Sequence, residues 1–195
     1  MWSLRSRTPA VLCVSLIIAS VTCCSVHPVS RQEPDPVDTL IKQAQAYAST
    51  GEYKKALDVY SSAYDKYNHN RNLLRHYAKT GGQIRNTADK AYQKKNYADA
   101  GRLYRILYDS HIVAKDFPES LSFDGKYLDS QMKACVRALM EIGLANYRAW
   151  EFEEAIAVWK KALAFYPEDK AIKIAIETAS SQLERLNAIN QPDKH

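Results

Sequence analysis

The chain has 195 residues, with 27 lysines and arginines against 22 aspartates and glutamates. The formal charge of +5 is mild and the basic residues are spread along the sequence, so composition indicates no nucleic-acid-binding face. Of its four cysteines, only Cys135 lies in the expected folded part, which argues against a disulfide framework.

Residues 1–22 are typical of an export signal. Arg5 and Arg7 precede an apolar run at residues 10–21. This run has the length of a secretory signal core and is too short to span a membrane as a helix. We therefore predict a signal peptide over residues 1–22. The proline-rich, polar residues that follow, up to position 36, read as a flexible tether.

The signal ends in the run SVTCCS at residues 20–25, which resembles the lipobox of bacterial lipoproteins. The resemblance implies that Cys23 or Cys24 carries a lipid anchor, so that residues 23–36 form an attachment site and tether. Neither Cys24 nor Ser25 is the aspartate that commonly retains lipoproteins in the inner membrane. An outer-membrane lipoprotein facing the periplasm is therefore expected. The alternative is an ordinary signal peptide that releases a soluble periplasmic protein.

A phrase of aromatic and small residues recurs three times along the rest of the chain. An aromatic is followed by a small residue three positions on, an aromatic at seven, and a small or apolar residue at ten, all on one helical face. A second helical pattern precedes each phrase, with a small residue (Ala44, Ala88 or Gly143) nine positions before it. The three phrases are Tyr53, Ala56, Tyr60, Ala63; Tyr97, Ala100, Tyr104, Leu107; and Phe152, Ala155, Trp159, Ala162.

On these residues the chain resembles the tetratricopeptide repeat family. The third unit, with Gly143 before the phrase and Pro167 after it, matches five motif positions; the first matches four and the second is degenerate. The resemblance implies an all-α, right-handed superhelix of about three helical hairpins plus a C-terminal capping helix. The expected domain covers residues 37–187, with repeats at about 37–70, 71–109 and 126–168, a cap at 169–187 and a disordered tail at 188–195.

The phrases are spaced more widely than the family period of about 34 residues. We expect the second hairpin to begin early, near Asn72, with Gly81 and Gly82 kinking or breaking its first helix. The other residues in excess of the family period lie at 110–125. They show no helical periodicity, so we predict an ordered loop there, anchored by apolar side chains. Such a loop either has a function of its own or merely packs on the third hairpin.

The sequence contains no recognisable catalytic motif. The histidines lack zinc spacing, no glycine-rich phosphate loop is present, and no serine or cysteine has an evident catalytic partner. Cys135 shares an apolar face with Leu139 and Ile142, which favours a small core residue over a reactive thiol. We therefore expect a protein that is not an enzyme and needs no metal or cofactor.

In the tetratricopeptide family the first helix of each hairpin lines a concave groove that binds peptide segments. Lys and Asn, which hold a C-terminal carboxylate in one branch of the family, are missing at Ile41 and Gln45, so an acidic C-terminal tail is not the expected ligand. Aromatic, Met and Arg side chains are typical anchors for bound segments. The resemblance implies these groove positions: Ile41, Gln45, Arg85, Asp89, Tyr92, Arg137, Met140, Leu144 and Arg148.

Together these features predict a non-catalytic interaction scaffold or adaptor of the bacterial cell envelope, serving assembly, secretion or pilus biogenesis. The expected partner is a protein or peptide segment of an envelope complex, with no nucleic acid and no small-molecule substrate. A structural subunit of a larger envelope complex, held through residues 110–125 and the cap, is the alternative.

Overall fold

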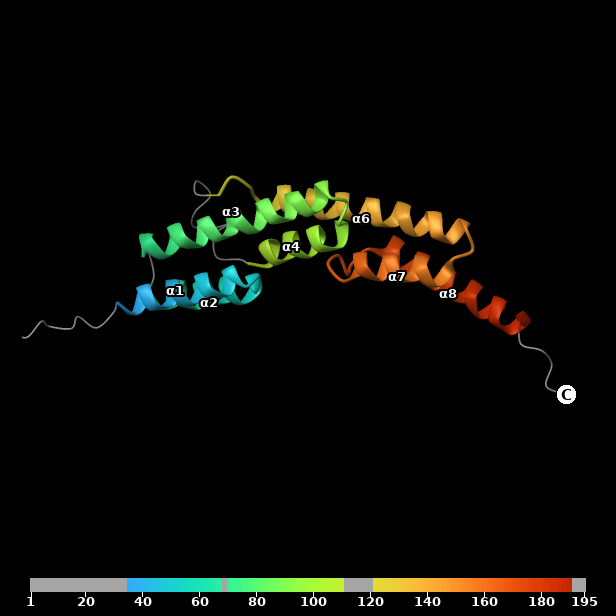
Figure 1. Ribbon diagram of the computed structural model, residues 1–195, viewed down its shortest axis with the longest axis horizontal. Helices are drawn as coiled ribbons and strands as arrows, with labels where there is room; N and C mark the ends of the chain where they lie inside the picture. Colours follow the sequence, from blue (N-terminus) through green and yellow to red (C-terminus); the bar gives the residue numbers. More distant parts are fainter. Residues whose placement is uncertain (1–34, 68–69, 111–120, 191–195) are drawn as a thin grey trace, which may run out of the picture. The chain divides into compact units, whose positions relative to one another are not determined.

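A computed structural model describes residues 35–67, 70–110 and 121–190 of the chain (Figure 1). These segments contain seven helices and no strand, which confirms the all-α class. None of the described helices is long and apolar enough to cross a membrane. The expected signal peptide, Cys23, Cys24, nearly all of the tether and most of the 110–125 loop lie outside the described residues. The helices are α1 Pro36–Ser49, α2 Tyr53–Lys66, α3 Arg71–Gln93, α4 Tyr97–Asp109, α6 Gly125–Arg148, α7 Phe152–Leu163 and α8 Lys170–Asn190.

The helices form three hairpins, α1–α2, α3–α4 and α6–α7, and α8 packs on α7 (Figure 1). The three hairpin turns have the same backbone geometry. Gly51, Lys95 and Trp150 have φ of 80°, 61° and 66°, and each precedes the next helix by two residues. The amide after each donates to the carbonyl five residues earlier, at 2.9 Å in every case. This is the Schellman C-cap, in which a left-handed residue ends the helix.

Side-chain caps mark where the first and third helices begin. Asp35 accepts a hydrogen bond from Val37 N at 2.9 Å, with Pro36 as the first helical residue. Asn70 caps α3 by accepting from the amides of Asn72 and Leu73, both at 3.0 Å. The early start of α3, near Asn72, is therefore confirmed.

The repeated phrase forms the core of the hairpins. Tyr60, Tyr104 and Trp159 are 1%, 1% and 3% exposed, and the small residues Ala44 and Ala88 are fully buried. A Cβ atom on Gly143 would lie 2.2 Å from Trp159 Nε1, closer than any real contact. Only glycine at position 143 therefore lets the indole lie directly against α6.

Helix α3 runs through Gly81 and Gly82 without a break, so the break considered there is wrong. Gly81 is buried, and a Cβ atom on it would contact Leu121 at 3.5 Å and Phe123 at 3.6 Å. The described end of the 110–125 loop thus packs on α3, in the second hairpin, through apolar side chains. Helix propensity is lost at a glycine pair, but packing along the long helix compensates for that loss.

A close contact joins the second and third hairpins. A Cβ atom on Gly101 of α4 would lie 2.4 Å from the ring of Phe165, which follows α7 and is 1% exposed. Helix α4 also packs extensively on α6. The contact of Gly101 with Phe165 does not follow from the repeat pattern, because both residues fall between its motif positions.

The C-terminal helix differs from the expected cap in length and in burial. It continues to Asn190, so residues 188–190 of the expected tail are helical. Ile172, Ile176, Ala179, Leu183 and Leu186 recur at helical spacing along the cap, but only Ile172 and Ala179 are buried and the other three are half-buried. Helix α8 covers α7 with its first half, and its second half has fewer neighbours to pack against.

Candidate partner-binding surface

Asp89, expected in the groove, is the centre of a polar network that joins three helices. Its Oδ1 atom accepts a hydrogen bond from Tyr104 Oη of α4 at 2.6 Å and from Tyr127 Oη of α6 at 3.1 Å. Burial raises the pKa of both tyrosines, and the bonds to the carboxylate raise it further. Both hydroxyl groups therefore stay protonated and donate to Asp89.

Arg85 belongs to the same network and holds the loop residues against α3. Its Nη1 atom donates to Ser122 Oγ at 2.7 Å, and its guanidinium lies 5.9 Å from the centre of the Phe123 ring. Its Nε atom is buried and lies 3.6 Å from Asp89 Oδ2, at ion-pair distance but beyond a hydrogen bond. Arg85 and Asp89 thus make contacts within the fold, while 25% and 31% of their side chains remain exposed.

Three other expected groove residues also contact other residues of the chain. Ile41 is 4% exposed and belongs to the core, so its placement in the groove is corrected. Gln45 is exposed but bonds to His76, with Nε2 and Nδ1 2.9 Å apart. Tyr92 is half-buried, with its ring 5.2 Å from that of Tyr97. The family pattern places residues on a helix face, but the neighbouring helices decide which of those residues are covered.

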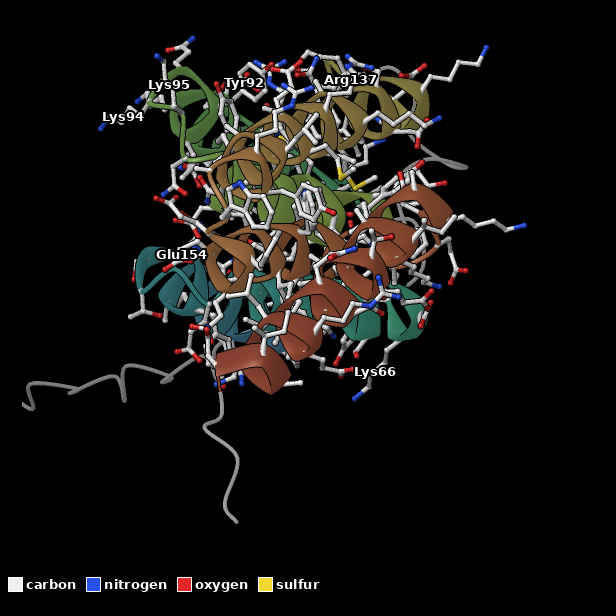
Figure 2. The ribbon with its side chains drawn as sticks, turned by 90° about the vertical axis from the view of Figure 1, so that its right-hand side faces the viewer. Lys66, Tyr92, Lys94, Lys95, Arg137 and Glu154 are labelled. Atoms are coloured by element: carbon white, nitrogen blue, oxygen red, sulfur yellow. The ribbon has the colours of Figure 1, made fainter. Side chains whose placement is uncertain are left out.

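The four remaining residues lie on α6, and this part of the first-helix surface is open. Arg137 and Arg148 are exposed. In Figure 2, Arg137 and Tyr92 project from the same side of the molecule. Met140 and Leu144 lie between the two arginines in sequence, and Leu144 is 40% exposed.

Met140 and Leu144 line a hollow of about 290 Å³ between α6 and α8. Its walls are almost entirely apolar, and Trp159 and Tyr147 contribute aromatic surface. The Tyr147 ring lies 5.1 Å from Phe152 and 6.2 Å from Trp159, while the indole N–H of Trp159 donates to Met140 O at 3.3 Å. The hollow is lined by Met140, Glu141, Leu144, Tyr147, Trp159, Ala175 and Thr178.

Ala175 and Thr178 were not expected at this surface, because α8 was interpreted only as a cap. Both lie on α8, three residues apart, and they leave space where larger side chains would close the hollow. The only sequence signal for their place at this surface was that both side chains on the cap helix are small and one of them is polar. Ile142, expected beside Cys135 in the core, is instead 40% exposed.

A second hollow, of about 360 Å³, lies between α1, α2 and α3 and has a different chemical character. Amide, hydroxyl, imidazole and ammonium groups form most of its lining. His76 and Gln45 hydrogen-bond to each other at its wall. The hollow is lined by Gln45, Ala48, Ser49, Tyr53, His76, Lys79, Thr80 and Gln83.

The described residues contain one buried free cysteine and no cluster of metal-ligating side chains. Cys135 is fully buried, and burial raises the pKa of its thiol to about 12, so the nucleophilic thiolate does not form near neutral pH. Across residues 35–67, 70–110 and 121–190, no three His, Cys, Asp or Glu side chains come close enough together to hold a metal ion.

No protein-family model matches the chain, and neither a curated protein nor a solved structure shows significant similarity to it.

Proposed function

We propose that this protein is a tetratricopeptide-like interaction scaffold of the bacterial envelope that binds a partner protein in the apolar hollow between α6 and α8. The observation that carries the proposal is the open, aromatic-walled hollow at Met140 and Leu144. Arg137 lies three residues before Met140 and Arg148 four residues after Leu144, so both share the face of α6 that lines the hollow. Exposed apolar surface of this kind is typical of protein interaction sites.

The repeat assignment is supported by the three hairpins and their equivalent turns. Each hairpin carries the aromatic phrase in its second helix and a buried small residue in its first. The left-handed residues Gly51, Lys95 and Trp150 occupy the same place in each turn. Stacked hairpins of this kind expose the first helices as a binding surface.

A protein segment is a better fit to the hollow than a small molecule. Small-molecule sites usually enclose about 300–1,000 Å³ and bury most of their ligand. This hollow is at the bottom of that range, opens to solvent, and has only Glu141 and Thr178 as polar side chains apart from the hydroxyl of Tyr147 and the N–H of Trp159. It suits a large apolar side chain that anchors a longer segment, as in most protein interfaces.

Leu144→Glu tests this site, because it places a charge at the edge of the hollow without touching the core. The full chain carrying a photocrosslinker at Thr178 is expected to capture a discrete partner in envelopes of its source organism. Leu144→Glu is expected to reduce that capture at least about tenfold, since a buried unpaired charge opposes docking. Ile174→Glu, on an α8 side chain that is 61% exposed and outside the hollow, is the matched control.

The alternative, a structural subunit held through residues 110–125 and α8, predicts a different outcome. Arg137→Glu combined with Arg148→Glu reverses two exposed charges on α6, on either side of Met140 and Leu144, and leaves residues 110–125 and α8 unchanged. Capture is lost in this variant under our proposal and retained under the alternative. Equal capture by Leu144→Glu and Ile174→Glu would exclude the hollow as the binding site.

The proposal includes a lipid anchor at Cys23 or Cys24, which holds the scaffold at the outer membrane facing the periplasm. An anchor would raise the local concentration of the scaffold near membrane-bound partners. Labelled palmitate is expected to be incorporated into the native chain and lost when both cysteines are replaced by alanine. Incorporation that survives the double replacement would rule out lipidation here and favour the soluble periplasmic form.

A further inference from the structure

The exposed face of α3 carries basic side chains in a single row. Arg71, Arg75 and Lys79 follow one another at four-residue spacing, and all three are exposed. Residues four apart lie one above the other on a helix, so the three cations share one stripe. Lys90 continues the stripe after polar residues. The row lies opposite the buried face of α3, which is formed by Leu73, Leu74, Tyr77, Thr80, Gly81, Ile84 and Ala88.

Within the described residues, none of the three cations is neutralised by an ion pair. Most exposed ion pairs lie within other helices, such as Lys54–Asp58 on α2 and Arg105–Asp109 on α4. Asp38, the acidic residue of α1, accepts a hydrogen bond from Asn72 Nδ2 at 3.5 Å and forms no ion pair with a cation of the described segments. The acidic residue of α3 itself, Asp89, is occupied by two tyrosines and Arg85. Positive charge is therefore concentrated on this face, although it is mild over the whole chain.

The polar hollow of about 360 Å³ opens beside this stripe and shares Lys79 with it. His76, Gln83 and Ser49 supply further hydrogen-bonding groups to its lining. A side chain that ends in a carboxylate would find both charge and donors there. The hollow therefore offers a recess for one side chain of a segment that lies along the row of charges.

The chemistry of the stripe favours an acidic protein segment over a membrane or a nucleic acid. The large apolar side chains exposed in the described part of the chain are Tyr108, Ile142, Leu144, Trp150, Ile174 and Ile189, and none of them is on α3. A membrane-binding face usually adds apolar side chains that enter the lipid, and a single-stranded nucleic-acid face adds exposed aromatics for stacking. A peptide carboxylate, by contrast, requires only cations and hydrogen-bond donors, and both are present on the stripe and in the polar hollow.

We propose that α3 binds an extended, acidic segment of a partner protein, with carboxylates paired to Arg71, Arg75 and Lys79 and one side chain in the adjacent hollow. The site is separate from the apolar hollow between α6 and α8 and does not depend on it. It recognises internal glutamates or aspartates rather than a terminal carboxylate. Electrostatic attraction of this kind speeds association and weakens as salt concentration rises.

The proposal is tested with the full chain and a short fluorescein-labelled peptide of alternating glutamate and serine, amidated at its C-terminus. Fluorescence anisotropy is expected to show saturable, salt-sensitive binding. Reversing the stripe with Arg71→Glu, Arg75→Glu and Lys79→Glu is expected to weaken binding about tenfold or more, since three exposed ion pairs are lost and become repulsive. The matched control reverses three exposed lysines elsewhere: Lys160→Glu, Lys161→Glu and Lys173→Glu.

The control changes the net charge by the same amount, so it separates the stripe from overall charge. Equal weakening in both triple variants would overturn the proposal, as would no binding by the native chain. Binding to vesicles that contain phosphatidylglycerol, lost in the stripe variant while peptide binding is retained, would assign the stripe to a membrane instead. Circular dichroism checks folding, and the milder Arg75→Gln with Lys79→Gln is expected to give an intermediate loss.

Discussion

Replacing Trp159 with alanine is expected to lower the free energy of unfolding by roughly 3–5 kcal/mol. The indole is 3% exposed and its N–H donates to Met140 O at 3.3 Å. The cavity left by its removal has little means of closing, because Gly143, which faces the indole, has no side chain to move into it. Urea unfolding followed by circular dichroism measures the change.

Trp150 provides a matched control for this substitution. It lies in the turn between α6 and α7, and 71% of it is exposed. Trp150→Ala is expected to change the free energy of unfolding by no more than about 0.5 kcal/mol, the usual range for surface changes. Similar losses for Trp150→Ala and Trp159→Ala would contradict the packing of the third hairpin described here.

Replacing Asp89 with alanine is expected to destabilise the protein by about 2–3 kcal/mol. The change leaves the hydroxyl groups of Tyr104 and Tyr127 without their acceptor, and it removes the carboxylate beside Arg85. Tyr104 is 1% exposed, so water cannot readily replace the lost bond. Thermal and urea unfolding should both report the loss.

Asp58 is the matched control for Asp89. It pairs with Lys54 at 3.2 Å, but its side chain is 63% exposed, so Asp58→Ala is expected to cost about 0.5 kcal/mol or less. Asp89→Asn retains an acceptor and should be milder than Asp89→Ala. If Asp89→Ala proves no more damaging than Asp58→Ala, the network contributes nothing to the joining of α3, α4 and α6.

Much of the fold could be predicted from the sequence because the relevant interactions are local. The caps of α1 and α3 follow from a side chain and amides two or three residues away. Each phrase predicts a buried helix face from residues within ten positions, and Tyr60, Tyr104 and Trp159 are buried as expected. The positive φ at Lys95 and Trp150 was less visible, because only Gly51 has the residue type that favours it.

The candidate surface was predicted less well, because it depends on which helices cover one another. Ile41 and Leu144 were both expected in the groove, yet one is 4% and the other 40% exposed. The difference arises from their neighbours: Ile41 belongs to the packed core, while the hollow between α6 and α8 leaves Leu144 open. No pattern within one helix carries that information.

By itself, then, the sequence determined the helices, their buried faces and the pairing of helices into hairpins, since these depend on residues close together in the chain. Only the tertiary structure decided which first-helix residues stay open, because contacts such as Gly101 with Phe165 and Arg85 with Ser122 join residues far apart. The tertiary structure also decided that Arg71, Arg75 and Lys79 of α3 lie together on a solvent-exposed face. A helix orders its charges along one face, but the packing of its neighbours determines whether that face meets solvent.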